Sequence, residues 1–294
     1  MILLTGATGV VGTALLRRLT TQGEPVRCLV RDPRRLGAER VRVQIALGDL
    51  ADPPSFRNAL RGVRTVVHLA ASIRDQPQGS IEELNGISTW RLVQAAERAG
   101  VEHFVFFSAL SASTHDRTRF LRSKALAEDA VRESSLRTTV FAPSIVYAPS
   151  DRYVALVQRL SLLPVTFVPG RGTALYQPIW ADDAADCVMG ALANGDGAPR
   201  RSRYELAGPD TLSHEAIVEL VTRAAGRRRP LVNVPSPLVR ATLRTAETLM
   251  KSKAPATWDE AELLEVSMVS RKGTTDAESL GVTPRPMAAV LGVR

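Results

Sequence analysis

Cysteine and long hydrophobic runs are scarce in this chain of 294 residues. Its two cysteines, Cys28 and Cys187, stand in predicted apolar elements and match no metal-ligand spacing, so we expect buried, reduced thiols. The four histidines are dispersed, so no metal site is expected. No stretch approaches the ~20 uninterrupted apolar residues of a membrane span, and the first strand is expected to begin at residue 2. We therefore expect a cytoplasmic protein without an integral membrane segment.

Lysine and aromatic side chains are also few. Basic residues exceed acidic ones by 38 to 30, giving a formal net charge of +8, and only four of them are lysine. The arginines are scattered, apart from Arg200-Arg201, Arg203 and the run 227–229. A nucleic-acid face combines clustered cations with stacking aromatics, and only 5% of the residues are aromatic. We therefore expect no nucleic-acid partner and interpret these runs as solvated faces.

Three glycines near the start of the chain carry the first functional signal. The sequence Thr5-Gly6-Ala7-Thr8-Gly9-Val10-Val11-Gly12 follows a short apolar run that predicts a buried strand. Gly6 permits a tight turn, Gly9 lets phosphates approach the main chain, and Gly12 lets the following helix lie close to the sheet. A helix over about residues 10–21 would direct its free N–H groups and positive dipole end toward the anion. The pattern therefore predicts a dinucleotide site.

Apolar runs alternate with segments of helical period along the first half of the chain. This alternation predicts an α/β protein, namely a Rossmann-type doubly wound parallel sheet with helices on both faces. After the glycine-rich loop, strands are expected at 26–30, 41–46, 65–69, 103–107 and 138–141.

The second half of the chain predicts a small, interleaved C-terminal substrate lobe. The pattern loosens after Pro143, returns to the sheet region, and leaves it again near Gly195. Further helices are expected near 213–225, near 237–250 and close to the C-terminus. We therefore assign the dinucleotide-binding domain to residues 1–147, returning at about 175–195, and the lobe to 148–174 and 196–294.

Arg31 follows the second predicted strand, where an acidic side chain usually binds the adenosine ribose. A guanidinium at this place favours the extra phosphate of NADP(H). Asp32 could still reach a ribose, so NADP(H) is favoured and NAD(H) stays open. Asp49 follows the third strand, where its carboxylate could bind the adenine amino group. His68 ends the fourth strand, and we expect it to be hydrogen-bonded rather than to transfer protons.

An ordered series of motifs over about residues 1–210 resembles the extended and atypical short-chain dehydrogenase/reductase superfamily. The chain is similar to the atypical branch that includes an accessory subunit of respiratory complex I and the NmrA-like proteins. The motifs lie at 5–12, 48–50, 68–71, 85–89, 107–111, 124–128, 143–147 and 177–183. The resemblance implies a cofactor site built from Thr5, Gly6, Thr8, Gly9, Val10, Val11, Gly12, Arg31, Asp49, Leu50, Leu69, Ala70, Ala71, Ser108, Lys124, Pro143, Ser144 and Ile145.

The resemblance also implies a Tyr-X-X-X-Lys pair, in which the phenol exchanges a proton and the lysine lowers its pKa and holds the nicotinamide ribose. Here the stretch reads Phe120-Leu121-Arg122-Ser123-Lys124, so the phenol is missing while Lys124 keeps its place. The serine that orients the substrate is assigned to Ser111, with Ser108 and Leu110 as the neighbouring alternatives. Groups that could replace the phenol are those of Tyr147, Thr118, Ser123 and His115.

Two functions are compatible with this pattern. The first is an oxidoreductase that uses NADPH on a small apolar carbonyl or quinone without the usual tyrosine. The second, favoured by Phe120, is a non-catalytic structural or redox-sensing protein that holds NADPH while its lobe docks a protein partner. The amphipathic segment 237–250 is expected to pack on the lobe core rather than lie on a membrane surface. We expect a monomer or a homodimer.

Overall fold

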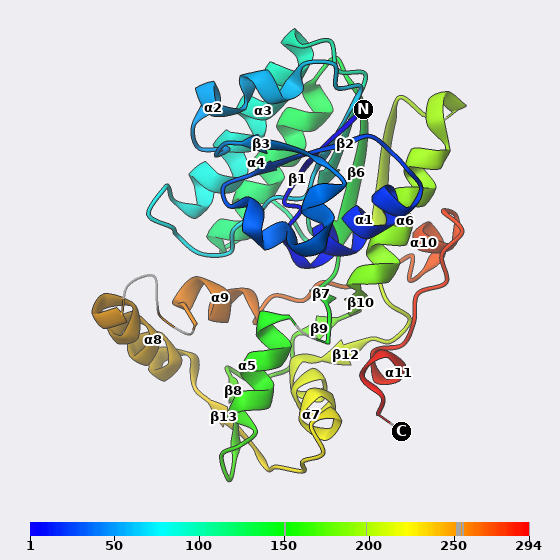
Figure 1. Cartoon of the computed structure of the whole chain (residues 1–294). Helices are drawn as coiled ribbons and strands as arrows, with labels where there is room; N and C mark the ends of the chain where they lie inside the picture. Colours follow the sequence, from blue (N-terminus) through cyan, green and yellow to red (C-terminus); the bar gives the residue numbers. More distant parts are fainter. Residues whose placement is uncertain (150, 198, 251–253, 255, 294) are drawn as a thin grey trace.

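Seven parallel strands form the central sheet of the protein, whose computed structural model describes residues 1–149, 151–197, 199–250, 254 and 256–293. Their order is β11-β6-β5-β4-β1-β2-β3 (Figure 1). The sheet is doubly wound because the order reverses between β1 and β4, which confirms the predicted fold class. The strands are β1 (Ile2–Thr5), β2 (Val26–Val30), β3 (Gln44–Leu47), β4 (Thr65–His68), β5 (His103–Phe107), β6 (Arg137–Pro143) and β11 (Arg201–Leu206).

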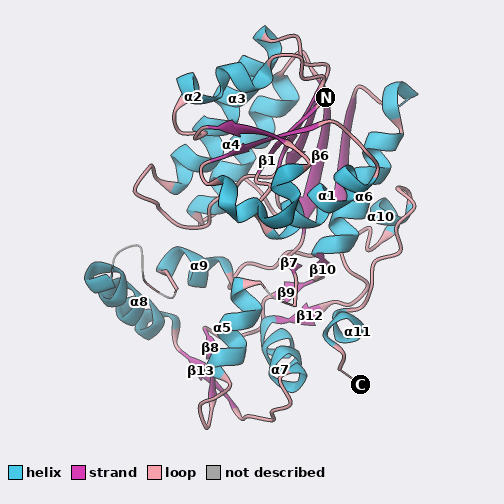
Figure 2. Ribbon diagram, in the orientation of Figure 1, coloured by secondary structure: helices cyan, strands magenta, loops and turns pink. Residues whose placement is uncertain are grey.

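Helices cover both faces of the sheet (Figure 2). Helices α1 (Val10–Thr21) and α6 (Ala181–Ala193) share one buried apolar cluster with the sheet, and α3 (Ser88–Arg98) and α4 (Arg119–Glu133) share another. Both predicted thiols are free and buried in the first cluster. Burial on both faces explains why these strands are continuous apolar runs. The shorter elements are η1 (Pro33–Val41), α2 (Pro53–Arg57), η2 (Asn58–Leu60), the π-helix η3 (Glu83–Ile87) and η4 (Gly195–Gly197).

Two strands differ from the prediction. The strand expected at 41–46 lies at Gln44–Leu47, because Val41 still belongs to η1. The seventh strand, β11, pairs with β6 although it comes from the segment 196–294 that was assigned to the lobe. Charged residues alternate along β11, and Arg203 pairs with Glu128 of α4 at 2.9 Å. An edge strand of this composition has no apolar run that a sequence pattern could detect.

The lobe lies below the carboxyl edge of the sheet in Figure 1. It contains three two-stranded pairs and a separate apolar core that includes Tyr147, Tyr176 and Ile217. The paired strands are β7 (Val146–Tyr147) with β10 (Ile179–Trp180), β9 (Leu175–Tyr176) with β12 (Leu212–Ser213), and β8 (Thr166–Pro169) with β13 (Leu231–Val234). The helices after β6, besides α6, are α5 (Arg152–Leu160), α7 (His214–Ala224), α8 (Ser236–Met250), α9 (Trp258–Leu263), α10 (Thr275–Glu278) and α11 (Met287–Leu291).

The carboxylate of Asp183 ties the C-terminal segment to α6. It accepts hydrogen bonds from the backbone N–H of Arg285 at 2.8 Å and from the Arg285 guanidinium at 2.8 and 3.1 Å. That guanidinium also lies 3.7 Å from the centre of the Trp180 ring. Because Asp183 is only 2% exposed, these contacts offset the cost of burying its charge and fix the lobe against the nucleotide domain.

Helix α8 does not pack on the lobe core as expected. No side chain of α8 is buried, and Leu238 and Leu249 are 56% and 78% exposed. Its contacts run to α9, including Arg240, whose guanidinium lies 5.4 Å from the centre of the Trp258 ring. An amphipathic period reports an apolar face but not what covers it. No helix in the described part of the chain is long and apolar enough to span a bilayer.

Candidate functional site

The glycine-rich loop between β1 and α1 is closed on itself and on β4. Gly6 has a φ of +74°, and a Cβ placed there would lie 2.5 Å from the backbone nitrogen of Ala70. A Cβ on Gly12 would lie 2.1 Å from the carbonyl oxygen of Gly6. Only glycine fits at both positions, which agrees with the roles predicted for the tight turn and the close helix.

The first turn of α1 has free backbone donors. Its N-cap is Gly9, which provides no side-chain cap, and the first helical hydrogen bond runs from the Thr13 N–H to the Gly9 carbonyl. The N–H groups of Val10, Val11 and Gly12 precede that bond. Uncapped N–H groups at the positive end of a twelve-residue helix form a site for an anion such as a pyrophosphate.

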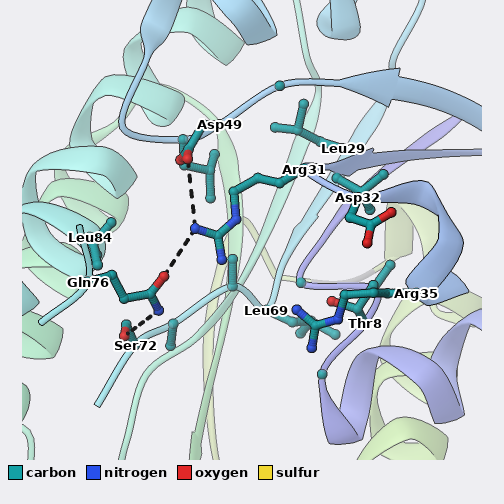
Figure 3. A pocket seen from close by; sticks show the side chains of 18 residues that line it. Thr8, Leu29, Arg31, Asp32, Arg35, Asp49, Leu69, Ser72, Gln76 and Leu84 are labelled. Atoms are coloured by element: carbon teal, nitrogen blue, oxygen red, sulfur yellow. Dashed lines mark hydrogen bonds and ion pairs between the residues drawn. The ribbon is translucent and has the colours of Figure 1, made fainter. Parts of the chain in front are cut away.

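A pocket of about 570 Å³ lies beside this loop at the carboxyl edge of the sheet (Figure 3). The strand ends that follow β1, β2, β3 and β4 all contribute to it. The predicted cofactor residues that line it are Gly6, Thr8, Gly9, Arg31, Asp49, Leu50, Leu69, Ala70 and Ala71. Asp32, the alternative ribose contact, also lines the pocket, as do residues that were not expected there, namely Ala7, Leu29, Val30, Arg35, Gly48, Ser72, Gln76 and Leu84.

Arg31 reaches across the pocket toward Asp49. Its guanidinium donates a hydrogen bond to the Gln76 side chain at 3.0 Å and lies 3.8 Å from the Asp49 carboxylate (Figure 3). Gln76 in turn donates to the Ser72 hydroxyl at 2.9 Å. The guanidinium is therefore held inside the pocket, between one carboxylate and one amide.

Arg35 is the second arginine of the pocket. Its side chain extends from η1 toward Thr8 at the glycine-rich loop (Figure 3). No ion pair of Arg35 occurs among the residues that the structure describes. Asp32 accepts a hydrogen bond from the Arg34 backbone N–H at 3.0 Å, so part of its carboxylate is used to cap η1. The pocket thus holds two guanidinium groups, and that of Arg35 forms no ion pair with any carboxylate in the described part of the chain.

The loop after β4 is held by the buried Asn85 and by a partly buried ion pair. The Asn85 amide accepts from the Ser72 N–H at 2.9 Å and donates to the Ser72 carbonyl at 2.8 Å. Arg74 binds Glu260 of α9 with N–O distances of 2.6 to 2.9 Å. These contacts place Ser72 and Gln76 at the pocket. In the sequence, only the motif at 85–89, which contains Asn85, indicated any of these contacts.

His68 is structural, as expected. Its imidazole is fully buried and hydrogen-bonds the hydroxyls of Thr5 at 2.6 Å and Thr89 at 2.9 Å. Burial lowers the pKa of His68 to about 3, and the positive charge of Lys124 acts in the same direction. The imidazole is therefore neutral at physiological pH. Thr5 uses its side chain here and does not line the pocket.

Lys124 is buried in the place where the family pattern expects it. Its Nζ donates to the backbone carbonyl of Phe107 and lies 4.7 Å from the centre of the Phe106 ring and 5.9 Å from that of Phe120. Burial lowers the pKa of Lys124 to about 7, and the Glu128 carboxylate opposes this shift. Phe120 is half-buried and supplies an apolar ring where a phenol was missing in the sequence.

The expected substrate serine has a structural contact. Ser111 has a φ of +64°, a strained value for a residue with a side chain, and its hydroxyl donates to the Ser267 carbonyl at 2.9 Å. Leu110 is buried in the lobe core, whereas the buried hydroxyl of Ser108 has no hydrogen-bond partner among the described residues. The structure thus turns Ser111 toward the C-terminal segment.

The segment after β6 is also bound to the C-terminal part of the chain. Ser144 donates to the Met268 carbonyl at 2.7 Å and accepts from the Gln177 N–H at 3.0 Å. Tyr147 is 1% exposed, and its hydroxyl has no partner in the described residues. Burial raises the pKa of Tyr147, with a further increase from the negative charge of Asp183. Pro143 and Ile145 do not line the pocket beside the glycine-rich loop.

Comparisons with known proteins agree with this geometry. A family model described as NAD(P)H-binding matches residues 6–164, more than half of the chain. The chain belongs to this NAD(P)H-binding family. It is 27% identical to the mitochondrial NADH dehydrogenase (ubiquinone) 1 alpha subcomplex subunit 9 of Arabidopsis thaliana, over 92% of this chain and 69% of that protein. It is 32% identical to the sterol demethylase protein B of Methylococcus capsulatus, over 81% and 78%.

The fold of this family member also matches solved structures. The NADPH complex of the NADPH-dependent quinone oxidoreductase QOR2 from Escherichia coli superposes with a TM-score of 0.75 at 18% sequence identity, covering 99% of both chains. At 18% sequence identity, this structural similarity shows that the two proteins share a fold and nothing further. The family match and the pocket geometry together show an NAD(P)-binding protein of the atypical short-chain dehydrogenase/reductase type, as the motifs predicted.

Proposed function

We propose that the protein binds NADP(H) in preference to NAD(H), with Arg31 and Arg35 at the adenosine phosphate. The support is electrostatic. The pocket contains two guanidinium groups, and among the described residues only that of Arg31 lies within ion-pair distance of a carboxylate. A 2′-phosphate would give both groups a charged partner. The glycine-rich loop and the free N–H groups of α1 would hold the pyrophosphate, and Lys124 would hold the nicotinamide ribose.

The same protein is proposed to be an oxidoreductase whose acceptor needs no proton from a tyrosine. Because the Phe120 ring lies beside the buried Lys124 where the family pattern has a phenol, an oxidoreductase built on this site would need an acceptor that takes no proton from the protein. When bound, NADPH would supply a hydride, and a quinone that accepted it would need only one proton, which water can supply, to become a quinol. Phe120 would exclude water on one side, while ordinary ketones would lack the acid that their reduction needs.

A second function has a specific observation in its favour. The hydroxyls of Ser111 and Ser144 bind the neighbouring carbonyls of Ser267 and Met268, so both side chains hold the C-terminal segment. Tyr147 is buried in the lobe core. Polar groups used for the fold are not free to orient a substrate, which favours a non-catalytic protein that holds NADPH while the lobe docks a partner.

One assay separates the two functions. Purified protein is incubated with NADPH and a panel of quinones, aldehydes and ketones, while loss of NADPH absorbance and bound NADPH are both measured. Turnover with quinones alone supports the oxidoreductase, and tight NADPH binding without turnover supports the binding protein. Failure to bind either dinucleotide would remove both. A variant with a blocked glycine loop, Gly9→Val, serves as the control for background oxidation.

A further inference from the structure

The far end of the lobe combines exposed leucines with arginines that form no ion pair among the residues the structure describes. Two turns meet there, residues 161–165 after α5 and residues 225–230 after α7, and the Thr166 N–H donates to the Pro230 carbonyl at 3.0 Å. In Figure 1 the green chain after α5 and the yellow chain after α7 reach the lower end of the lobe, away from the sheet. We call this end, with the β8/β13 ribbon, the lobe tip.

Apolar side chains at the lobe tip face solvent. Leu162 and Leu163 are 63% and 44% exposed at the turn itself. Phe167 and Val232 are 44% and 41% exposed and stand opposite each other in the β8/β13 register, so they share one face of the ribbon. Exposed apolar side chains on a turn and on the neighbouring strand face form a surface that favours an apolar partner.

Positive charge surrounds these side chains. The guanidinium of Arg229 donates to the Ser161 carbonyl at 3.2 Å, and that of Arg227 to the Ser161 hydroxyl at 3.4 Å, next to the two leucines. Neither of them nor Arg228 forms an ion pair within the described chain. The lobe tip, residues 161–169 and 225–234, contains these three arginines and no Asp or Glu.

We propose that the lobe tip docks the protein on an anionic phospholipid bilayer. Arginines of the turn 225–230 would bind lipid phosphates, while Leu162 and Leu163 would enter the boundary between headgroups and acyl chains. A second copy of the chain fits this surface poorly, because two arginine-rich tips repel each other. A nucleic acid needs stacking aromatics, and Phe167 is the one aromatic residue of the tip as defined. None of the residues of this surface lines the dinucleotide pocket.

Vesicle co-sedimentation with the full-length protein tests this surface. We expect binding to phosphatidylcholine vesicles that contain about one third phosphatidylglycerol, weakening at high salt, and little binding to pure phosphatidylcholine. The variant Arg227→Gln/Arg228→Gln/Arg229→Gln should lose about fivefold in affinity for each arginine, roughly a hundredfold in all. Leu162→Ser/Leu163→Ser should lose at least about tenfold at unchanged charge.

Matched controls alter exposed residues elsewhere. Arg42→Gln/Arg57→Gln/Arg98→Gln removes the same charge from the nucleotide domain, and Val41→Ser/Leu47→Ser removes exposed apolar groups there. Both should bind vesicles nearly as the natural protein does, and all variants should keep its NADPH affinity and circular dichroism. Equal losses in the controls, equal binding to neutral vesicles, or full binding by the leucine variant would each overturn the proposal. So would sedimentation velocity showing that the tip leucines instead sustain a dimer, or tip-dependent binding to DNA or to an acidic protein without vesicle binding.

Discussion

The ammonium group of Lys124 lies 5.9 Å from the centre of the Phe120 ring, one helical turn away on α4. A tyrosine at that position would bring its hydroxyl to the same side of the helix as the lysine. The chain therefore keeps the cation of the pair and replaces the proton carrier with an apolar ring. This pairing is compatible with dinucleotide binding but removes the group through which carbonyl reduction usually obtains its proton.

Restoring the hydroxyl should create a weak carbonyl reductase. We expect negligible reduction of ordinary aldehydes and ketones by the natural protein, and measurable NADPH-dependent turnover in Phe120→Tyr. A general acid is typically worth about 10²- to 10⁴-fold in rate. The gain should fall below that range because the Ser111 hydroxyl is held by Ser267 and is not free to orient the substrate. Steady-state rates with a carbonyl panel measure the effect.

Phe120→Leu is the matched control for this variant, because it keeps an apolar side chain at the same half-buried position. It should remain inactive and should bind NADPH like the natural protein. Robust carbonyl turnover by the natural protein that is unaffected by Phe120→Ala would mean that another residue donates the proton. The assignment of Phe120 as the vacant acid position would then be wrong.

The nucleotide half of the site was predictable because its signals are local. Gly6, Arg31 and Asp49 each follow a strand, and parallel strands end at one edge of the sheet, so residues far apart in sequence meet there. Gln76 was missed because its position depends on a loop held by Asn85 and by an ion pair with Glu260 of α9. No spacing rule encodes such long-range contacts.

The lobe was less predictable, for two physical reasons. An apolar pattern shows that a helix has an apolar face, but it does not show whether another element covers that face. In α8 no residue is buried, so the prediction that it packs on the lobe core was wrong. The hydroxyl of Ser111 was assigned to the substrate by register alone, yet its positive φ turns the chain so that the hydroxyl meets Ser267. Backbone strain at one residue and the return of the C-terminal segment decide such contacts.

The two arginines of the pocket should set the preference for NADPH over NADH. Loss of a charged hydrogen bond costs about 1.5 to 3 kcal/mol, or roughly ten- to hundredfold in affinity. We expect Arg31→Ala and Arg35→Ala each to weaken NADPH binding by such a factor and to leave NADH binding nearly unchanged. Arg34→Ala is the control, because it removes the same charge from a neighbour that does not line the pocket. Equal affinities of the natural protein for both dinucleotides in calorimetry would contradict the preference.

Gly9→Val should abolish dinucleotide binding without unfolding the protein. Gly9 has an ordinary backbone conformation with a φ of −82°, and an added Cβ would have one close neighbour, the Gly6 carbonyl oxygen at 3.3 Å. The remaining valine atoms would occupy the path of the pyrophosphate. Gly197→Val, at a position where a Cβ meets nothing within 4 Å, controls for the substitution itself. A Gly9→Val protein with native circular dichroism and native NADPH affinity would show that the loop does not bind phosphate.

Acid should destabilise the protein through His68. Burial lowers its folded-state pKa to about 3 from the ordinary 6.5, so between these values the unfolded chain binds a proton that the folded protein excludes. Stability is therefore lost as pH falls through this window, at up to about 1.4 kcal/mol per pH unit for this one group. His68→Asn should reduce the slope of unfolding free energy against pH between about 6 and 4, whereas His115→Asn, at an exposed loop position, serves as the control. His103 and His214, whose pKa values burial lowers to about 4, should leave a remaining slope of the same sign.

Imidazole NMR that finds His68 protonated in folded protein at pH values near 6, or an unchanged slope in His68→Asn, would contradict this prediction. Either result would mean that the Thr5 and Thr89 hydroxyls stabilise the charged ring instead.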